Sequence, residues 1–242
     1  MEHVVYNGVD LSERFMVIGV TRPLPTPTPT IELVSGGNRN NVRGIDLVPP
    51  TLSFRLVTKE RDRLRRRDEL HWLASVLLVD EPVMVQFSSD DGKRYKVVPT
   101  GDLSFHEYVQ SGFMDVQLQC VEAAMYGEER SATSSGGVVT FLVRGNYQTP
   151  LRVEAASATR QSSSDYRYGF TLDNGTVAYL EIPTSSSSSV IMDGEEREAT
   201  VNGSVAQLTL QSDWLEAAPG SHTLRRTMGS GEFTVSWVER WL

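Results

Sequence analysis

The sequence lacks any long hydrophobic run. No segment approaches the roughly 18 consecutive apolar residues that a membrane-spanning helix requires. Residues 1–8 have neither a basic start nor an apolar core, so they do not read as a secretory signal. These absences predict a protein that neither inserts into a membrane nor enters a secretion pathway.

Cysteine is nearly absent, because Cys120 is the only one among 242 residues. A single cysteine excludes an intrachain disulfide and any metal site built from several thiolates, and it is typical of a reducing compartment. Cys120 lies in the alternating stretch 113–121, where Met114, Val116 and Leu118 share its face. We therefore expect a buried core thiol and not a nucleophile.

Positive charge is in the minority. The chain has 23 Lys and Arg against 31 Asp and Glu, for a net charge of −8. Residues 1–128 hold 14 bases and 18 acids, and residues 129–242 hold 9 bases and 13 acids, so both halves are acidic. This balance argues against a general binder of nucleic acid or of anionic membranes.

Motifs that carry chemistry are missing as well. The four histidines are scattered, and none has a histidine or cysteine partner at metal-ligand spacing. There is no nucleophile elbow, phosphate-binding glycine loop or dinucleotide fingerprint. The sequence therefore predicts no catalytic, metal-binding or cofactor-binding residues, no cofactor, and a protein that is not an enzyme. A hydrolase is the remotest of the functions considered.

What the sequence does contain is a mainly β pattern with one clear helix, expected near residues 59–79. Leu70, Leu73, Ala74 and Leu77 recur at helical spacing and form one apolar stripe. Pro82 limits the helix, because the residue before a proline avoids the α conformation. The rest of the chain alternates between apolar and polar residues, as strands do.

The pattern divides into two domains. We expect an N-terminal β-sandwich-like domain over residues 1–128, a linker of small polar residues over 129–137, and a C-terminal β-sandwich over 138–242. In the last segment, short strands alternate with turn signals such as Asn174-Gly175, as in sandwiches and jelly rolls.

Two segments stand out as candidate subunit interfaces. Alternate prolines remove backbone donors, so residues 21–30 predict an extended polyproline-like segment, either a surface loop or an arm that reaches a neighbouring subunit. Five arginines lie in the first turns of the expected helix, either as a solvated face or as a salt-bridge strip against an acidic partner. The candidate interface residues are Pro23, Pro25, Pro27, Pro29, Arg61, Arg63, Arg65, Arg66 and Arg67.

Tryptophans near the C-terminus suggest a second kind of site. Trp214 and Trp241 are candidates for stacking against sugar rings, as exposed aromatic faces do in sugar-binding sandwiches. Trp237 lies in phase with Phe233 and Val235, which indicates the core instead.

Taken together, the order and spacing of short motifs along nearly the whole chain resemble the distal tail protein family of siphophages. The N-terminal half carries Asn7-Gly8-Val9-Asp10-Leu11-Ser12, Leu70-His71-Trp72-Leu73, Glu81-Pro82, Arg94-Tyr95, 112–120 and Tyr126-Gly127. The C-terminal half carries Gly145-Asn146, Pro150, Asn174-Gly175, Met192-Asp193-Gly194, Asp213-Trp214-Leu215, Pro219-Gly220-Ser221-His222-Thr223-Leu224, Trp237 and Trp241.

The resemblance implies a fold and a role. Family members have an N-terminal ring-forming domain with a helix and a C-terminal domain similar to galectins and carbohydrate-binding modules. Six copies form a ring that joins the tail tube to the baseplate or tail fibre and leaves a channel through which DNA passes without specific binding. The implied partners are the tail tube protein, the tape-measure protein and tail-tip, lysin or receptor-binding proteins.

The implied location is the tail tip of the virion, with host cytoplasm during assembly. The alternative function is a carbohydrate-binding module that recognises host cell-wall glycans.

Overall fold

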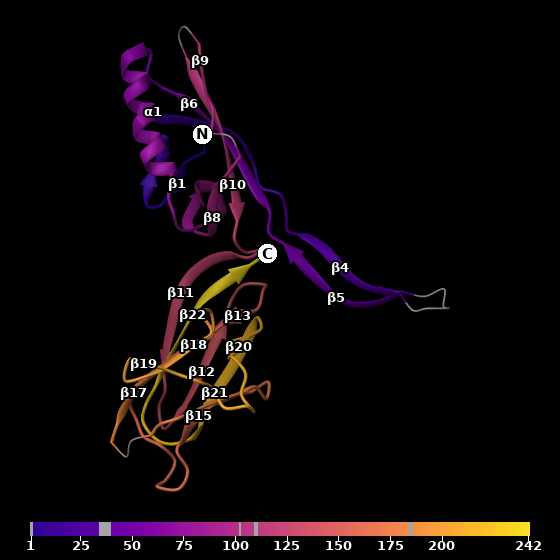
Figure 1. Cartoon of the computed structure of the whole chain (residues 1–242), viewed down its shortest axis with the longest axis vertical. Coiled ribbons are helices and arrows are strands. Elements are labelled where there is room, and N and C mark those ends of the chain that lie inside the picture. The colour runs from indigo at the N-terminus through magenta and orange to yellow at the C-terminus, as the bar shows by residue number, and fades with distance from the viewer. Residues whose placement is uncertain (1, 34–39, 102, 109–110, 184–185) are drawn as a thin grey trace. The chain divides into compact units, whose positions relative to one another are not determined.

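The structure is a computed structural model, and it describes residues 2–33, 40–101, 103–108, 111–183 and 186–242. The chain forms two compact units, residues 1–126 and 127–241 (Figure 1). The fold is mainly β with a single α-helix among the described residues, as the sequence predicts. No helix in the described part of the chain has the length and apolarity needed to cross a bilayer.

The first unit is built on an antiparallel sheet with the strand order β3-β6-β10-β8-β7-β1-β2, and β9 lies beside one end of β10. Its elements are β1 (Val4–Tyr6), β2 (Val9–Asp10), the 3₁₀ turn η1 (Leu11–Glu13), β3 (Phe15–Thr21), β6 (Thr51–Thr58), β7 (Val83–Phe87), the 3₁₀ turn η2 (Ser88–Asp90), β8 (Arg94–Thr100), β9 (Phe105–Glu107) and β10 (Gly112–Cys120).

Helix α1 (Arg63–Leu77) supplies part of the core of this unit. It begins later than residue 59 because the Asp62 carboxylate caps it, accepting hydrogen bonds from the backbone N–H groups of Leu64 and Arg65 at 2.9 and 3.0 Å. Leu73 and Leu77 are buried against the sheet, so the predicted apolar stripe is confirmed. Cys120 is 3% exposed in the same core, and burial raises the pKa of its thiol to about 12, which confirms a core thiol.

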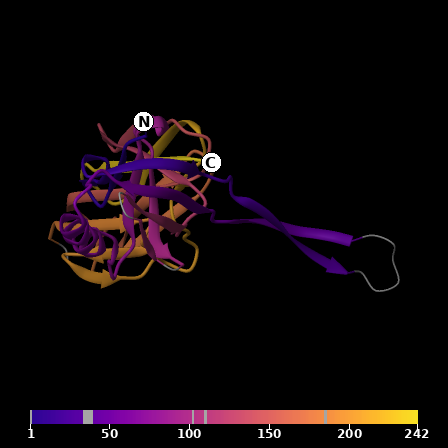
Figure 2. The same cartoon turned by 90° about the horizontal axis from the view of Figure 1, so that it is seen from above.

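The proline-rich segment is a strand. Strand β4 (Thr26–Leu33) pairs antiparallel with β5 (Asn40–Val48), and within the described residues these two strands pair with no others. We call the pair the ribbon; Figure 2 shows its strands twisting around each other. The segment over 21–30 is extended, as expected, but from Thr26 onward it is a paired strand and not a polyproline-like segment.

The second unit is a sandwich of two antiparallel sheets, β19-β18-β17-β14-β22-β11 and β12-β21-β15-β16, with the short pair β13-β20 beside them. Its strands are β11 (Met125–Thr133), β12 (Val138–Val143), β13 (Thr149–Pro150), β14 (Arg152–Ala158), β15 (Arg167–Leu172), β16 (Val177–Glu181), β17 (Ser188–Asp193), β18 (Glu198–Val201), β19 (Ser204–Ala206), β20 (Glu216–Ala217), β21 (Gly220–Met228) and β22 (Thr234–Trp241).

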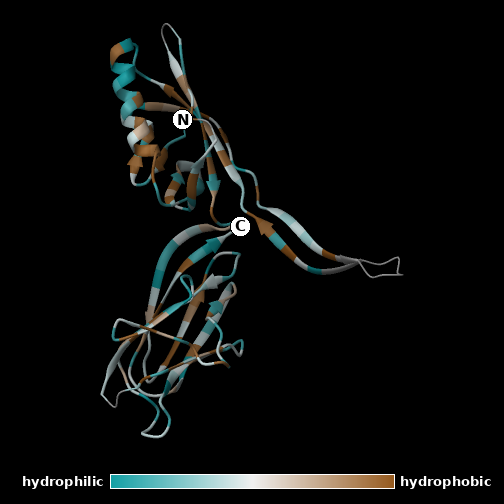
Figure 3. Ribbon diagram, viewed as in Figure 1, coloured by the Kyte–Doolittle hydropathy of each residue, from teal (hydrophilic) through white to brown (hydrophobic). Residues whose placement is uncertain are grey.

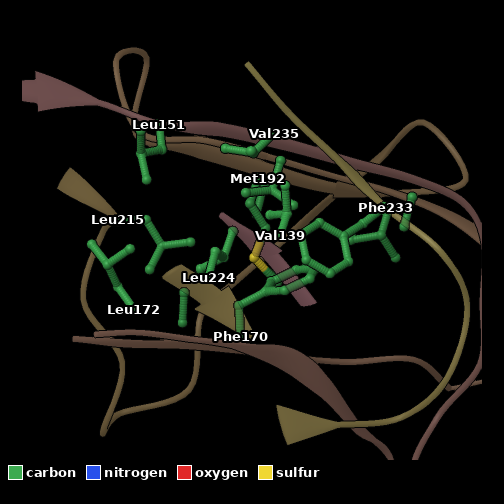
Figure 4. Packing of buried hydrophobic residues seen from close by; sticks show 14 of the residues in the cluster. Val139, Leu151, Phe170, Leu172, Met192, Leu215, Leu224, Phe233 and Val235 are labelled. Atoms are coloured by element: carbon green, nitrogen blue, oxygen red, sulfur yellow. The ribbon is translucent and has the colours of Figure 1, made fainter. Parts of the chain in front are cut away.

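Along the strands, every second side chain points between the two sheets, and these apolar side chains fill the space there. Figure 4 shows Val235 and Met192 from one sheet packing toward Phe170 and Leu224 from the other. Phe170 and Phe233 meet edge to face, with ring centroids 4.7 Å apart. The core of the unit is therefore closed on both faces by its own strands.

Within the expected linker of residues 129–137, residues 129–133 belong to a strand. Strand β11 runs through Thr133 and pairs with β22. The Arg130 guanidinium donates to the Glu239 carboxylate at 2.7 Å, and the Glu239 side chain is 6% exposed. Polar residues in this stretch are therefore strand residues that pair across the sheet.

Candidate functional site

The ribbon is the first candidate assembly surface, and its prolines occupy defined places in it. Pro23 and Pro25 precede β4, whereas Pro27 lies opposite Leu47 and Pro29 lies opposite Ile45. A proline has no N–H, so within a two-stranded pair it fits only where its nitrogen faces away from the partner strand. The inward hydrogen bonds of β4 must therefore come from the threonines between the prolines.

The two faces of the ribbon differ in polarity. Pro27, Pro29, Ile45 and Leu47 share one face, because side chains alternate along a strand and opposed residues lie on the same side. The other face carries Thr28, Thr30 and Asp46, with the Thr30 hydroxyl 3.4 Å from the Asp46 carboxylate. Figure 3 colours the pair by residue hydropathy: most of β4 is pale to light teal, and β5 has a brown stretch at its end.

Most of the apolar face is exposed, and only Leu47 on it is half-buried. Pro27 and Pro29 are exposed, and the Ile45 side chain is 63% exposed. Ile31 and Val48 in the same ribbon are also about half exposed. An isolated two-stranded hairpin is marginally stable in water. The ribbon is therefore an element whose apolar side chains the first unit does not use.

The helix arginines, the second candidate, separate into two classes. Arg61, Arg63, Arg65 and Arg67 are exposed. Arg63 lies 3.5 Å from the Glu107 carboxylate, and Arg65 lies 4.0 Å from that of Glu60. Exposed pairs at these distances contribute little to stability, so these side chains remain available to a partner.

Arg66 is the exception, because its side chain is only 2% exposed. Its guanidinium donates to the Glu107 carboxylate at 3.3 Å and to the backbone carbonyls of Tyr108 and Arg61 at 3.2 and 3.3 Å. Arg66 thus ties the first turn of α1 to the end of β9. Its prediction as a surface interface residue is wrong for that reason.

A third feature, which no sequence pattern predicts, is a polar and aromatic surface on β6, β9 and β10. The Arg55 guanidinium makes a two-point contact with the Asp115 carboxylate at 2.7 and 2.9 Å and lies 4.2 Å from the centre of the Phe113 ring. The Arg55 contact lowers the pKa of Asp115. His106 and Tyr108 stack on Phe113, with centroid distances of 4.9 and 5.8 Å. These contacts join strands that are far apart in sequence, so periodicity within one strand does not reveal them.

The tryptophans proposed for sugar stacking occupy separate elements. Trp214 precedes β20 and packs, half-buried, against the core of the second unit. Trp241 ends β22 and lies half-buried beside Gly127, where an added Cβ would approach its indole nitrogen to 3.0 Å. Trp237 is 5% exposed, which confirms its prediction as a core residue.

The second unit also carries an open groove of about 980 Å³ beside the edge strands β16 and β19. Exposed Val205 and Leu210 contribute apolar surface, and Arg167 and Glu181 contribute charge. The residues from 201 to 211 that line much of it have no clear period, so the sequence pattern does not predict this groove.

His222 has a polar partner at each of its ring nitrogens. The His222 ring places Nδ1 3.0 Å from the Asp173 carboxylate and Nε2 2.7 Å from the Ala218 carbonyl oxygen, so neither nitrogen faces a hydroxyl nucleophile. Within the described ranges, no three His, Cys, Asp or Glu side chains gather as metal ligands do.

Comparisons with known proteins place the whole chain among phage tail components. Residues 14–120 match the family model described as a phage tail protein RIFT-related domain, and residues 144–241 match the siphovirus-type tail component, C-terminal domain. No curated protein matches the chain in sequence.

Solved structures with the same fold come from two phages. The Dit protein of phage SPP1, described as a paradigm of hub adsorption apparatus in phages that infect Gram-positive bacteria, aligns over 100% of both chains with a TM-score of 0.78 and 17% identity. A chain of the phage p2 baseplate in its activated conformation with Sr aligns over 97% of both chains with a TM-score of 0.56 and 8% identity.

Proposed function

The chain belongs to the distal tail protein family of siphophages, and on this premise we propose that six copies of it form a ring at the tail tip. The ring joins the tail tube to the baseplate or fibre, so tube and tape-measure proteins contact one side of it. Tail-tip, lysin or receptor-binding proteins dock on it from the other side. It assembles in the host cytoplasm and acts in the virion without catalysis.

The observation that carries this proposal is the uncovered ribbon. Its apolar face includes Ile45 at 63% exposure and the exposed Pro27 and Pro29, and within the described residues its two strands pair only with each other. An apolar surface of this kind marks a site that a partner covers. A head-to-tail contact between identical chains closes into a ring when its rotation allows, and the exposed arginines of α1 offer a second surface for that contact.

The charge of the chain suits a conduit for DNA. Both halves are acidic, each with four more acids than bases. An acidic surface repels phosphates and does not retain a passing duplex. This predicts that the assembled ring binds DNA weakly and without sequence preference.

The proposal is tested by measuring the mass of the full chain by mass photometry and by imaging it with negative-stain microscopy. We expect a species of six chains at micromolar concentration. The matched variant replaces residues 23–50 by Gly-Asn-Gly, because Thr21 and Ser53 are already paired and a short turn can join β3 to β6. This variant should fold and remain monomeric. A monomeric wild-type chain with no ring in the images would count against the ring.

The alternative, binding of cell-wall glycans, has less support. Both tryptophans are half-buried: Trp214 packs against the core, and Trp241 lies beside Gly127 at the end of β22. A glycan array probed with the full chain separates the two functions. Binding that is lost in Trp241→Ala but kept in Trp237→Phe would favour a sugar site.

A further inference from the structure

The ribbon joins the first unit through two short segments that belong to no strand. Residues 22–25 lead from β3 into β4, and residues 49–50 lead from β5 into β6; we call these two segments the root. Just before the root, β3 bulges: its register against β6 shifts between Ile18 and Thr21, and Gly19 adopts a left-handed conformation with a φ of +62°. Since the described ribbon strands pair only with each other, side chains at the root must set the direction of the ribbon.

The outgoing side of the root is held by Arg22. Its guanidinium donates to the Asp90 carboxylate and to the Ser89 hydroxyl, the latter at 2.9 Å. It also lies 5.2 Å from the centre of the buried Phe87 ring. Because the Arg22 and Asp90 side chains are both partly buried, water and salt screen this ion pair less than they screen a pair on the open surface.

The turn η2 that receives Arg22 is itself bonded to the start of the chain. The Glu2 carboxylate accepts hydrogen bonds from the Ser89 backbone N–H at 3.0 Å and from the hydroxyls of Ser88 and Ser89 at 3.1 and 2.8 Å. The Ser88 backbone N–H donates to the His3 carbonyl at 3.0 Å. Arg22 therefore fastens the root to a turn that is already tied to the residues before β1.

The returning side of the root is held by Gln119, which lies in β10. Its side-chain Nε2 donates to the carbonyl oxygens of Pro49 and Pro50 at 3.0 and 3.4 Å, and its Oε1 accepts from the Thr51 hydroxyl at 2.7 Å. The Cys120 backbone N–H donates to the Pro50 carbonyl at 3.0 Å. Prolines have no N–H, so their carbonyl oxygens are the backbone groups by which this segment can be tied.

We infer that Arg22 and Gln119 are positioning residues, which together fix the direction in which the ribbon leaves the first unit. They act through the ribbon and need no contact with a partner of their own. A surface that is already oriented in the free chain loses less freedom when a partner covers it, so the contact becomes tighter. This inference rests on the proposed role of the ribbon in assembly, but the direction itself can be measured in the monomer.

Time-resolved FRET at nanomolar concentration measures the spread of ribbon directions in the full chain. Thr28→Cys and His71→Cys place one dye on the exposed polar face of the ribbon and one on α1, where His71 is exposed. Cys120 stays unlabelled, because it is buried and burial raises the pKa of its thiol to about 12. We expect a narrow distance distribution, and one at least twofold broader when Arg22→Gln or Gln119→Glu is added.

Gln119→Glu has a matched control on the same strand. It keeps the size of the side chain but replaces the Nε2 donor by an oxygen, which cannot bond to a proline carbonyl. Gln117→Glu adds the same charge two residues earlier in β10, where the side chain is exposed and lies opposite Ser53 and Thr100 instead of the root. The distance distribution should therefore stay narrow in Gln117→Glu.

Arg22→Gln has two controls. Arg152→Gln removes a similar arginine–aspartate contact from the second unit, where the guanidinium donates to Asp193 at 2.9 Å, and should leave the distribution narrow. Arg22→Lys keeps a cation next to Asp90 and should restore part of the narrow distribution that Arg22→Gln loses. This rescue separates the charge contact from a general effect of changing the residue.

Mass photometry of the same variants connects direction with assembly. Arg22→Gln and Gln119→Glu should raise the concentration at half-assembly at least threefold, and circular dichroism should show that their sheets are retained. A broad distribution in the wild type, or an unchanged one in both variants, overturns the inference and leaves the ring standing. Broader distributions with unchanged assembly overturn the positioning role. A monomeric wild type whose narrow distribution broadens in the variants overturns the ring and supports the fixed direction.

Discussion

The ribbon and the hairpin β15–β16 are the same local element in two different settings. Both are antiparallel pairs of short strands with alternating side chains. In β15–β16, the inward residues Phe170, Leu172, Ala178 and Leu180 are at most 1% exposed. In the ribbon, Ile45 on the equivalent apolar face is 63% exposed. One hairpin therefore buries its apolar side chains within its own unit, whereas the other leaves most of its apolar face exposed.

The largest effect should come from removing a side chain on which the closed hairpin depends. Phe170→Ala deletes a fully buried ring that contacts Tyr168 and Phe233. The expected loss is about 3–5 kcal/mol in the free energy of unfolding of the second unit. Urea unfolding followed by tryptophan fluorescence measures it.

The matched change in the ribbon is Ile45→Ala. Because this side chain is mostly exposed in the monomer, the free energy of unfolding should change by less than about 0.5 kcal/mol. Self-association, measured by mass photometry, should weaken instead. A large loss of monomer stability in Ile45→Ala would show that the ribbon packs on its own unit. It would contradict the contrast drawn between the ribbon and the hairpin β15–β16.

The same contrast exists within one helix, between two adjacent arginines. Arg66→Ala leaves the Glu107 carboxylate and the Tyr108 carbonyl without their buried donor, so we expect a loss of about 2–3 kcal/mol. Arg67→Ala should cost less than about 0.5 kcal/mol, since Arg67 is exposed. Thermal unfolding of the two variants gives the comparison, and equal losses would contradict it.

Much of the fold could be predicted because buried apolar residues recur at regular spacing, every three or four residues in a helix and every second residue in a strand. The stripe Leu70, Leu73 and Leu77 placed α1, and Cys120 was in phase with three apolar neighbours. Arg66 precedes Leu70 by four residues and Leu73 by seven, so it lies on the same stripe. The position of Arg66 on this stripe therefore indicates that it is buried. Its charge, in contrast, favours a place on the surface, and the prediction followed the charge.

Strands β4 and β11 were not predicted, because the residues that each of them pairs with lie elsewhere in the chain. Prolines in β4 looked incompatible with pairing, yet a missing N–H matters only on the side that faces β5. The polar stretch of β11 looked like a linker, yet Arg130 finds its partner Glu239 more than a hundred residues later. The prolines suggested the proposed assembly surface, but its apolar face became visible only with the register of β5.

The smallest expected effect concerns a buried hydroxyl in the closed sandwich. The Tyr168 side chain is fully buried, and its OH has no hydrogen-bond partner among the described residues. A buried donor without a partner is costly, so Tyr168→Phe should leave stability at pH 7 unchanged or raise it by up to about 1 kcal/mol. Chemical unfolding at pH 7 measures this change, and a loss of more than 1 kcal/mol would reveal a hydrogen bond to the hydroxyl.

The alkaline behaviour of the same variant sharpens the contrast with the ribbon, which has no tyrosine among its described residues. Burial raises the pKa of Tyr168 to about 12 from an ordinary value of 10. Between these values the unfolded chain loses its proton first, so stability is complete below pH 10 and falls as pH rises toward 12. By pH 11 the loss from this residue is about 1.4 kcal/mol. Tyr168→Phe should remove that part of the slope, whereas Ile45→Ala should leave the slope unchanged, and identical pH profiles for wild type and Tyr168→Phe would mean that water reaches the hydroxyl.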